Sequence, residues 1–349
     1  MSFSIVEKSN MKAARFHSKT RLLSVDDVDL PQISSNEVLL KVRAAGVCHT
    51  ELHFLDGMIP ISGEAMTLGH EISGEVSKVG SEVTNVRPGD RVIVNNCVPC
   101  NNCMQCFEGR ENLCDNIQQL GFTIDGGFAE FVKVRSDLVV SLPQSVSFEQ
   151  GAALTCGSAT CYHALFDVGN LTSKDTMLIN GTGGVGFSAL QIAKNAGAAC
   201  IAVDVVDEKL DLAKKEFGAD YTINGKKENV AEKVKELTRG KGVDILLEFV
   251  GIPATMKYSM DVLSKKGRIV FVGYTSADYV VSPLNMILKE ASVLSAIAYR
   301  KSNLIAVRDL TERGKLRPLV TGRYQLSQID EPLNQLRNGT AIGRSVLVF

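Results

Sequence analysis

Four closely spaced cysteines offer the most specific chemistry in this sequence. They follow the pattern Cys-x2-Cys-x2-Cys-x7-Cys and are Cys100, Cys103, Cys106 and Cys114. Four thiolates on one short loop can surround zinc as a closed tetrahedron, with each sulfur about 2.3 Å from the ion. A closed site has no position for a substrate, so the pattern predicts a zinc ion that holds this loop in its folded form. Cys97, three residues before Cys100, is a further candidate ligand.

Disulfide bonds are the alternative for clustered cysteines, and the composition argues against them. The 349 residues include nine cysteines, an odd number, and the first ten residues, MSFSIVEKSN, are polar. We therefore expect a cytoplasmic protein with reduced thiols, in which clustered cysteines more often bind metal. Cys161 and Cys200 have no partner pattern, and small buried side chains are the expected role for both.

A second group of metal-binding residue types, Cys48, His70 and Glu71, precedes the cysteine loop. Sulfur, imidazole nitrogen and carboxylate oxygen are all ligands that zinc accepts. Because the four-cysteine site is closed, we expect the chemistry of the protein to take place at this second group.

A glycine-rich segment in the middle of the chain predicts a dinucleotide site. Residues 175–180 predict a buried strand and residues 187–196 a helix, with Gly-Thr-Gly-Gly-Val-Gly between them. In this context Gly181 permits a tight turn, Gly183 lets backbone N–H groups approach a pyrophosphate, and Gly186 lets the helix pack closely on the strand. The N-terminus of the helix then faces the phosphates.

Asp204 ends the next predicted strand, residues 200–204, and lies 18 residues after Gly186. A carboxylate at this position can accept hydrogen bonds from the adenosine ribose and would repel a 2′-phosphate, so NAD is expected rather than NADP. The alternative role for Asp204 is to cap the helix predicted at residues 207–217.

Strands and helices continue to alternate after this unit, which predicts a doubly wound parallel sheet. The later strands are predicted at residues 221–224, 243–250, 268–273 and 292–298, and the helices at 228–238 and 253–263. Short strands separated by Gly and Pro turns indicate a β-rich first domain. These strands are predicted at residues 38–47, 72–79, 90–94 and 128–134.

The overall composition excludes several classes of partner. The chain is 45% hydrophobic and 22% charged, with a formal net charge of -1. It has no basic tract that would bind nucleic acid and no apolar run long enough to span a bilayer. We therefore expect no nucleic-acid and no membrane partner, but small molecules and other copies of the chain.

With these motifs together, the chain resembles the zinc-containing alcohol dehydrogenases of the medium-chain dehydrogenase/reductase superfamily from Met11 to Phe349. The matching segments are 46–53, 69–74, 89–92, the cysteine loop, 126–130 and 181–186. The resemblance implies an α/β fold in two domains, with the active site in the cleft between them. A GroES-like catalytic domain with both zinc sites would comprise residues 1–156 and 296–349, and a Rossmann NAD-binding domain residues 157–295. Residues 1–10 would be an extension without function.

The resemblance also implies a catalytic zinc held by Cys48, His70 and Cys156, with the fourth position open to water or substrate. Glu71 would bind the metal transiently, or would only balance its charge. The small residues and Tyr-x-Ala-Leu motif that follow Cys156 match the family pattern, which selects it over Cys161.

Roles in proton transfer carry over to Thr50 and His53. Zinc lowers the pKa of a bound alcohol, and the hydride would then pass to the nicotinamide. By the resemblance, Thr50 contacts the substrate oxygen and His53 passes the proton to solvent by way of the cofactor ribose. The alternatives are an ordinary turn residue at Thr50 and an exposed histidine without a role at His53.

Other cofactor contacts are also implied position by position. His49 would contact the pyrophosphate, Lys209 the adenosine ribose, and Arg344 a phosphate; the alternative for each is an ordinary surface charge. The expected cofactor-binding set is His49, Gly181, Gly183, Gly184, Val185, Gly186, Asp204, Lys209, Val272 and Arg344.

The expected reaction is the reversible, zinc-dependent oxidation of an alcohol to an aldehyde or ketone by NAD. Polyols, amino alcohols and a cyclic alcohol carried as a CoA thioester are alternative substrates, and a zinc-free enoyl or quinone reductase of the same fold is an alternative function. Glu51 stands where most relatives have Asp. The short connection between Cys114 and Gly126 resembles the bacterial, archaeal and fungal group, so a homotetramer is expected, with a dimer as the alternative.

Overall fold

The computed structural model describes residues 9–349 of the chain. The expected N-terminal extension, residues 1–10, therefore lies outside the described residues except for Ser9 and Asn10, and Asn10 begins the first strand. No helix in the described range is long and apolar enough to cross a membrane.

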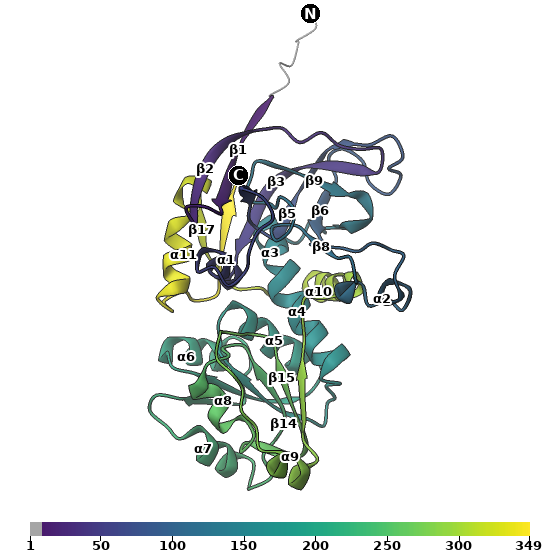
Figure 1. Cartoon of the computed structure of the whole chain (residues 1–349). Coiled ribbons are helices and arrows are strands. Elements are labelled where there is room, and N and C mark those ends of the chain that lie inside the picture. Colours follow the sequence, from purple (N-terminus) through teal and green to yellow (C-terminus); the bar gives the residue numbers. More distant parts are fainter. Residues whose placement is uncertain (1–8) are drawn as a thin grey trace, which may run out of the picture. The chain divides into compact units, whose positions relative to one another are not determined.

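The chain divides into two compact units. The first comprises the chain up to Cys156 together with Arg300–Arg308 and Val320–Phe349. The second comprises Gly157–Tyr299 and Asp309–Leu319. Figure 1 shows that the first unit is mostly β-stranded, whereas helices flank a sheet in the second.

The first unit is built on a seven-stranded sheet with the order β10-β6-β5-β3-β18-β17, in which β9 also pairs with β3. These strands are β3 Glu37–Val47, β5 Glu71–Val79, β6 Arg91–Val94, β9 Phe131–Arg135, β10 Val139–Ser141, β17 Val320–Tyr324 and β18 Arg344–Val348. A three-stranded sheet, β2-β1-β4, and a short pair, β7-β8, complete the unit. Their bounds are β1 Asn10–His17, β2 Leu22–Asp29, β4 Ala65–Thr67, β7 Cys97–Val98 and β8 Gln118–Gln119.

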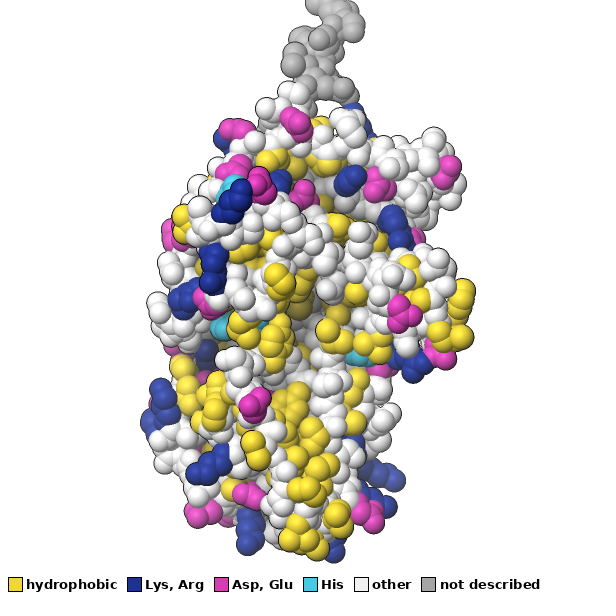
Figure 2. All heavy atoms as spheres, viewed as in Figure 1, with side chains coloured by type: hydrophobic (Ala, Val, Ile, Leu, Met, Phe, Trp, Pro, Cys, Tyr) yellow, Lys and Arg dark blue, Asp and Glu magenta, His cyan; other side chains and the backbone are white. Residues whose placement is uncertain are grey.

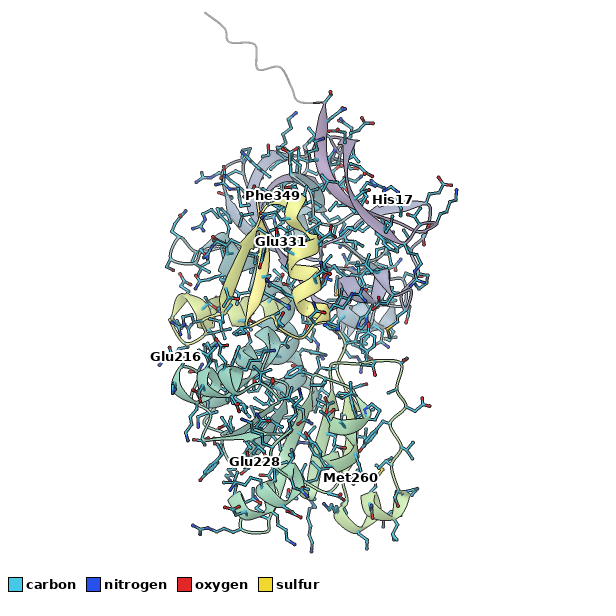
Figure 3. All side chains as sticks on the ribbon, turned by 90° about the vertical axis from the view of Figure 1, so that its left-hand side faces the viewer. His17, Glu216, Glu228, Met260, Glu331 and Phe349 are labelled. Atoms are coloured by element: carbon cyan, nitrogen blue, oxygen red, sulfur yellow. The ribbon has the colours of Figure 1, made fainter. Side chains whose placement is uncertain are left out.

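Strand β3 lies inside the sheet, and its side chains are buried along almost its whole length. It pairs antiparallel with β5 and with β18, where Val346 lies opposite Gly46. The C-terminal strand therefore completes the sheet beside the segment that leads to Cys48. Figure 3 shows this C-terminal part of the unit, with Glu331 on α11 and the terminal Phe349 labelled.

Short helices connect the strands of the first unit. They are α1 His49–Leu55, α2 Met104–Phe107, α3 Phe148–Ala153 and α11 Asp330–Arg337, with 3-10 turns at Glu111–Leu113, Ser136–Leu138 and Leu326–Gln328. Helix α10, Lys301–Glu312, begins in this unit, and its residues from Asp309 belong to the second. Helix α3 starts with reciprocal bonds between Ser147 and Gln150, in which each side chain accepts from the other's backbone N–H. This capping box is a strong local start signal.

The second unit contains a six-stranded parallel sheet with the order β13-β12-β11-β14-β15-β16. The strands are β11 Thr176–Asn180, β12 Ala199–Asp204, β13 Tyr221–Asn224, β14 Val243–Glu248, β15 Leu263–Phe271 and β16 Ser292–Ser295. Its helices are α4 Ala159–Tyr162, α5 Gly184–Asn195, α6 Asp207–Lys215, α7 Val230–Leu237, α8 Pro253–Ser259 and α9 Pro283–Lys289. The strand order reverses between β11 and β14, and the carboxyl ends of strands at such a switch point form a ligand-binding crevice. The predicted Rossmann-like parallel sheet is confirmed.

Element types agree with the sequence predictions in this unit, but several ends differ. Strand β14 ends at Glu248, two residues early, because the carboxylate of Glu248 accepts the next two free backbone N–H groups and turns the chain. Strand β15 begins at Leu263, five residues before the predicted start, and Leu263 pairs with Val243 across an irregularity in the ladder. Helix α8 correspondingly ends at Ser259.

Candidate active site

Cys48 lies between the end of β3 and the start of α1. Its backbone N–H donates a hydrogen bond of 2.7 Å to the carboxylate of Glu51, which is fully buried in the first turn of α1. A negative charge is favourable there because the first N–H groups of a helix have no partner within the helix. The contact fixes the backbone from which the Cys48 thiol projects.

The same carboxylate holds His70. The Nδ1 atom of His70 donates to Glu51 Oε1 at 2.9 Å, which leaves Nε2 buried without a hydrogen-bond partner. The preceding Gly69 has φ 92°, and a Cβ added to it would lie 2.3 Å from the ring of Phe128, so a glycine is required before the histidine. A buried nitrogen without a partner is unfavourable, and Nε2 is the atom that a metal ion can bind.

Cys156 completes the group from a distant part of the chain. It lies in a π-helical turn, Leu154–Ser158, a conformation that often occurs at functional sites. One ligand atom from each of Cys48, His70, Glu71 and Cys156 lies within 4.8 Å of the others. The hydrogen bond between the two thiols lowers the pKa of Cys48 well below its usual value and raises that of Cys156.

Glu71 is fully buried at the start of β5. Burial raises the pKa of its carboxyl to about 8, against the opposing charge of Arg344, whose guanidinium donates to Glu71 Oε1. The other oxygen, Oε2, is buried without a partner. Gly46 lies opposite Glu71 in the sheet, and a Cβ there would come within 1.9 Å of Oε2. The glycine therefore provides the space that this carboxylate occupies.

Thr50, His53 and His49 project from α1 beside this cluster. The Thr50 hydroxyl lies 3.6 Å from the Cys48 sulfur. His53 is buried, and burial together with the neighbouring His49 lowers its pKa. His49 is exposed, and its ring centroid lies 5.6 Å from that of His53 in an edge-on arrangement. The helix thus carries polar groups from the buried thiol to the surface.

The four clustered cysteines form a second group of ligand atoms within 4.8 Å of one another. The sulfur of Cys103 lies 3.5 Å from that of Cys106 and 3.9 Å from that of Cys114. Thiolates about 2.3 Å from a tetrahedral zinc ion are separated by about 3.8 Å, so these spacings fit zinc. A hydrogen bond from the backbone of Asn102 lowers the pKa of Cys100 to about 6, which favours its thiolate.

Cys97 does not belong to this group among the residues that the structure describes. It is buried in β7, where the Gln119 side chain donates to its sulfur at 3.8 Å. The cysteine loop is tied to its surroundings by Arg135, which donates to the carbonyl of Pro99 at 2.7 Å. The loop geometry therefore separates Cys97 from the four sulfurs that converge.

The glycine segment of the second unit forms the turn between β11 and α5. Gly181 has φ 92°, and a Cβ on Gly186 would lie 2.1 Å from the Gly181 carbonyl oxygen, so both glycines are required by the protein itself. Gly183 precedes the first residue of α5, and a Cβ there would meet no protein atom within 4 Å. Open space above a helix N-terminus fits a pyrophosphate group, which the dipole and free N–H groups favour.

Asp204 ends β12 and contacts this turn directly. Its Oδ2 accepts from the backbone N–H of Thr182 at 2.8 Å and from the Thr182 hydroxyl at 3.0 Å. Its Oδ1 accepts from the backbone N–H groups of Val205 and Val206 at 2.7 and 3.1 Å. The carboxylate thus orders both the glycine turn and the turn before α6.

The other expected cofactor residues lie at different depths. Lys209 is buried in the first turn of α6 and is therefore not an ordinary surface charge. Gly184 and Val185 form the first turn of α5, and the Val185 carbonyl accepts from the Cys161 thiol at 3.2 Å. Val272 follows β15, and its N–H donates to the Glu248 carbonyl at 3.0 Å.

Comparisons with known proteins decide the family. Residues 34–144 match the family model for the alcohol dehydrogenase GroES-like domain, and residues 184–313 match that for zinc-binding dehydrogenase. An NAD-dependent alcohol dehydrogenase from Sulfurisphaera tokodaii is 35% identical over 347 residues, which cover 97% of this chain and 100% of the relative. The chain belongs to the zinc-containing alcohol dehydrogenases of the medium-chain dehydrogenase/reductase superfamily.

Solved structures support the same assignment. The alcohol dehydrogenase of the archaeon Aeropyrum pernix matches with a TM-score of 0.90 and 34% identity over 97% of this chain and 100% of that chain. An acetophenone reductase from Geotrichum candidum, solved with NAD, matches with a TM-score of 0.90 and 28% identity over 98% of both chains. The present alcohol dehydrogenase is thus an oxidoreductase whose cofactors are zinc and NAD.

Two groups of functional interest escaped the sequence analysis. Thr182 is a fully buried residue of the glycine turn that binds Asp204 with both its N–H and its hydroxyl. Glu248 is almost fully buried at the end of β14 and bonded to Asn180 of β11. The available signal was that Glu248 directly follows the apolar run Ile245–Leu247 within the strand predicted at residues 243–250.

Substitution of single glycines separates folding from cofactor binding. We expect Gly186→Ala to lower both the melting temperature and NADH affinity, because its Cβ would collide with the Gly181 carbonyl. Gly183→Ala should leave the melting temperature unchanged and raise the Kd for NADH about tenfold or more, because only a ligand occupies that space. Calorimetry and NADH fluorescence titration measure the two quantities. An equal loss of stability in both variants would contradict this reading of the turn.

The four-cysteine group should govern stability rather than chemistry. Cys103→Ser is expected to reduce bound zinc from two ions to one per chain and to lower the melting temperature by about 10 °C. Metal analysis and calorimetry test this, and Cys97→Ser serves as the matched control, because it removes a nearby sulfur outside the group. Loss of zinc in the Cys97 variant would refute the assigned ligand set.

Proposed function

We propose that the group of Cys48, His70 and Cys156 carries the oxidation of a small alcohol to an aldehyde or ketone. The observation behind this proposal is the buried His70 Nε2, which has no hydrogen-bond partner and faces two thiols and a carboxylate. Two sulfurs and one nitrogen leave one position of a tetrahedral metal for substrate, in contrast to the closed four-cysteine group.

The residues around the group prepare it for this role. Zinc supplies a Lewis acid that brings the pKa of an alcohol toward neutrality, and NAD accepts the hydride. Glu51 holds the proton of His70 on Nδ1, which fixes the tautomer in which Nε2 has a free lone pair. The buried carboxylate of Glu71 is held by Arg344, and its Oε1 lies 3.9 Å from His70 Nε2. It would balance the positive charge of a bound zinc ion and offer a further oxygen ligand.

Thr50 and His53 carry the proton away in this proposal. The Thr50 hydroxyl, beside the Cys48 sulfur, accepts a hydrogen bond from the substrate hydroxyl. His53 lies one turn further along α1, and its lowered pKa keeps it neutral and able to accept a proton near pH 7. The exposed His49 lies against His53 and connects it to solvent.

The substrate class that we propose is a simple primary or secondary alcohol. A cysteine, Cys156, as the third ligand in place of a carboxylate favours this class weakly over polyols. The Geotrichum candidum neighbour is named for the reduction of acetophenone, so secondary alcohols with an aromatic group belong among the candidates. Amino alcohols and CoA-linked cyclic alcohols remain alternatives because substrate choice depends on pocket shape.

The test follows NADH absorbance with the purified protein, NAD and a panel of linear, branched, aromatic, polyol and CoA-linked alcohols. We expect turnover that a zinc chelator removes. Cys48→Ser should lower the turnover rate at least about a thousandfold, while the Kd for NADH stays within twofold of the parent value. Retained turnover in Cys48→Ser would eliminate the zinc group as the reaction centre.

Asp204 is proposed to select NAD over NADP. Asp204→Gly removes the charge that opposes a 2′-phosphate, so kcat/KM for NADP should rise relative to NAD by about tenfold or more. Thr182→Val is the control, because it breaks one bond to the same carboxylate and leaves the charge in place. Steady-state kinetics with both cofactors measure kcat/KM for NADP relative to NAD in each variant. An unchanged ratio in Asp204→Gly would contradict the ribose assignment.

We also propose a cytoplasmic homotetramer, in which one interface lies on the second unit. Strand β16 is the last strand of its sheet, and an exposed strand edge is suited to pairing with another chain. Exposed apolar side chains of Leu284, Ile287 and Leu288 lie on α9, with Val280 just before it. Figure 2 shows apolar side chains gathered on this face. Such a patch is typical of an interface between copies.

The double variant Ile287→Glu/Leu288→Glu should lower the mass in solution, because burial of two carboxylates in an apolar interface is unfavourable. Light scattering after gel filtration measures the mass. Leu22→Glu on β2 is the control, since Leu22 is similarly exposed at 64% but lies in the first unit. A tetramer that survives in the double variant would exclude this face as an interface.

A further inference from the structure

The carboxyl ends of three parallel strands meet at one buried residue in the second unit. Glu248 ends β14, has 1% exposure, and lies opposite Asn180, the last residue of β11. These two strands flank the point where the strand order reverses. Loops that leave the sheet at such a point form the binding crevice of doubly wound folds.

The side chain of Glu248 accepts three hydrogen bonds. Its Oε1 accepts from the backbone N–H groups of Val250 and Gly251, both at 2.8 Å. Its Oε2 accepts from the Asn180 amide at 2.8 Å. Because every partner is an N–H donor, both oxygens must act as acceptors, and glutamate is the side chain of this length with two acceptor oxygens.

The backbone of Glu248 holds the loop after β15. Its carbonyl oxygen accepts from the N–H groups of Val272 and Gly273 at 3.0 and 2.9 Å. A Cβ added to Gly273 would lie 2.0 Å from the carbonyl oxygen of Phe249, so the two loops are in close backbone contact. The loop after β14 is also bonded by the Thr275 hydroxyl, which donates to the Gly251 carbonyl at 2.7 Å.

The third loop is the glycine turn that begins at Gly181. Asn180 precedes it, and the Asn180 side chain is fixed at both ends, by Glu248 and by the Tyr258 hydroxyl, which donates to it at 2.6 Å. A Cβ on Gly181 would lie 2.9 Å from the side chain of Val250, so this turn packs against the loop that Glu248 holds. The position of the phosphate turn therefore depends on the same carboxylate.

We propose that Glu248 is a positioning residue for NAD, which sets the three loops of the crevice through Asn180 and the backbone of residues 249–251 and 272–273. The inference rests on the proposed function only in that NAD is the ligand of this unit. Glu248 acts through backbone groups and Asn180 and has no part in the chemical step. Its loss should weaken cofactor binding more than it weakens the fold.

A set of variants separates these effects. In Glu248→Gln the NH2 group replaces one acceptor oxygen and meets a donor in either orientation, the Asn180 amide or the N–H groups of Val250 and Gly251, so the Kd for NADH should rise about tenfold. The exchange variant Asn180→Asp/Glu248→Gln restores every bond with one donor reversed and keeps the same net charge, so its Kd should return to within about threefold of the parent value. Tyr258→Phe removes only the hydroxyl that holds Asn180 and should raise the Kd about threefold, which provides a test if Glu248→Gln does not fold.

Asp244 provides a matched control at the other end of β14. It accepts from the Thr176 N–H at 2.8 Å and from the Ser264 hydroxyl at 3.0 Å, so it also links neighbouring strands, but at their amino ends. Asp244→Asn should lower the melting temperature and leave the Kd for NADH within about twofold. Hydrogen exchange of the Val250 and Gly251 amides, which bond the Glu248 side chain, should rise in Glu248→Gln and not in Asp244→Asn.

Fluorescence titration of NADH, calorimetry and hydrogen exchange give readouts that are independent of turnover. A parent protein that binds NADH but oxidises no alcohol refutes the proposed reaction and leaves this test intact. The inference is overturned if Glu248→Gln binds NADH like the parent, if Asp244→Asn weakens binding equally, or if the exchange variant folds without recovering affinity.

Discussion

Two buried carboxylates, Glu51 and Glu71, impose the constraint on which the catalytic group depends. An ionised carboxylate removed from water is strongly unfavourable unless hydrogen bonds and opposite charge compensate it. Glu51 is compensated by the Cys48 N–H and the His70 ring, and Glu71 by Arg344. Within these three side chains, two buried atoms remain without a hydrogen-bond partner, His70 Nε2 and Glu71 Oε2, and both residues belong to the group that fits zinc. The hydrogen bonds that compensate the buried carboxylates therefore also hold the candidate metal ligands close together.

Close backbone packing makes this arrangement possible. A Cβ on Gly126 would lie 2.2 Å from the carbonyl oxygen of Gly69, and one on Gly121 would lie 2.7 Å from the Gly69 carbonyl carbon. The absence of a side chain at Gly46 likewise leaves room for the side chain of Glu71. Strands β3, β5 and β18 can then place Cys48, Glu71 and Arg344 together, although the last two are separated by 273 residues.

In the second unit, the half-buried Asp204 and the buried Glu248 have a comparable structural role. Asp204 ends β12 and Glu248 ends β14, and both strands pair with β11. Each carboxylate accepts hydrogen bonds from backbone N–H groups of the loops at this end of the sheet. These loops would otherwise leave donors without partners, which is unfavourable in a buried site. The carboxylates thus stabilise the loops, and we propose that the charge of Asp204 also faces the adenosine ribose of NAD.

Local patterns by themselves predicted the family, the fold class and the cofactors, and the comparisons with known proteins confirmed them. Four cysteines within fifteen residues and a glycine turn between a strand and a helix are short-range features, in which spacing along the chain directly sets distances in space. Tertiary structure alone decided that Cys97 lies outside the four-cysteine group, that Arg344 binds Glu71, and that Glu248 joins three loops. Pairs of this kind depend on strand order and register. Those are settled by the packing of the whole sheet and leave only a weak signal in any single segment.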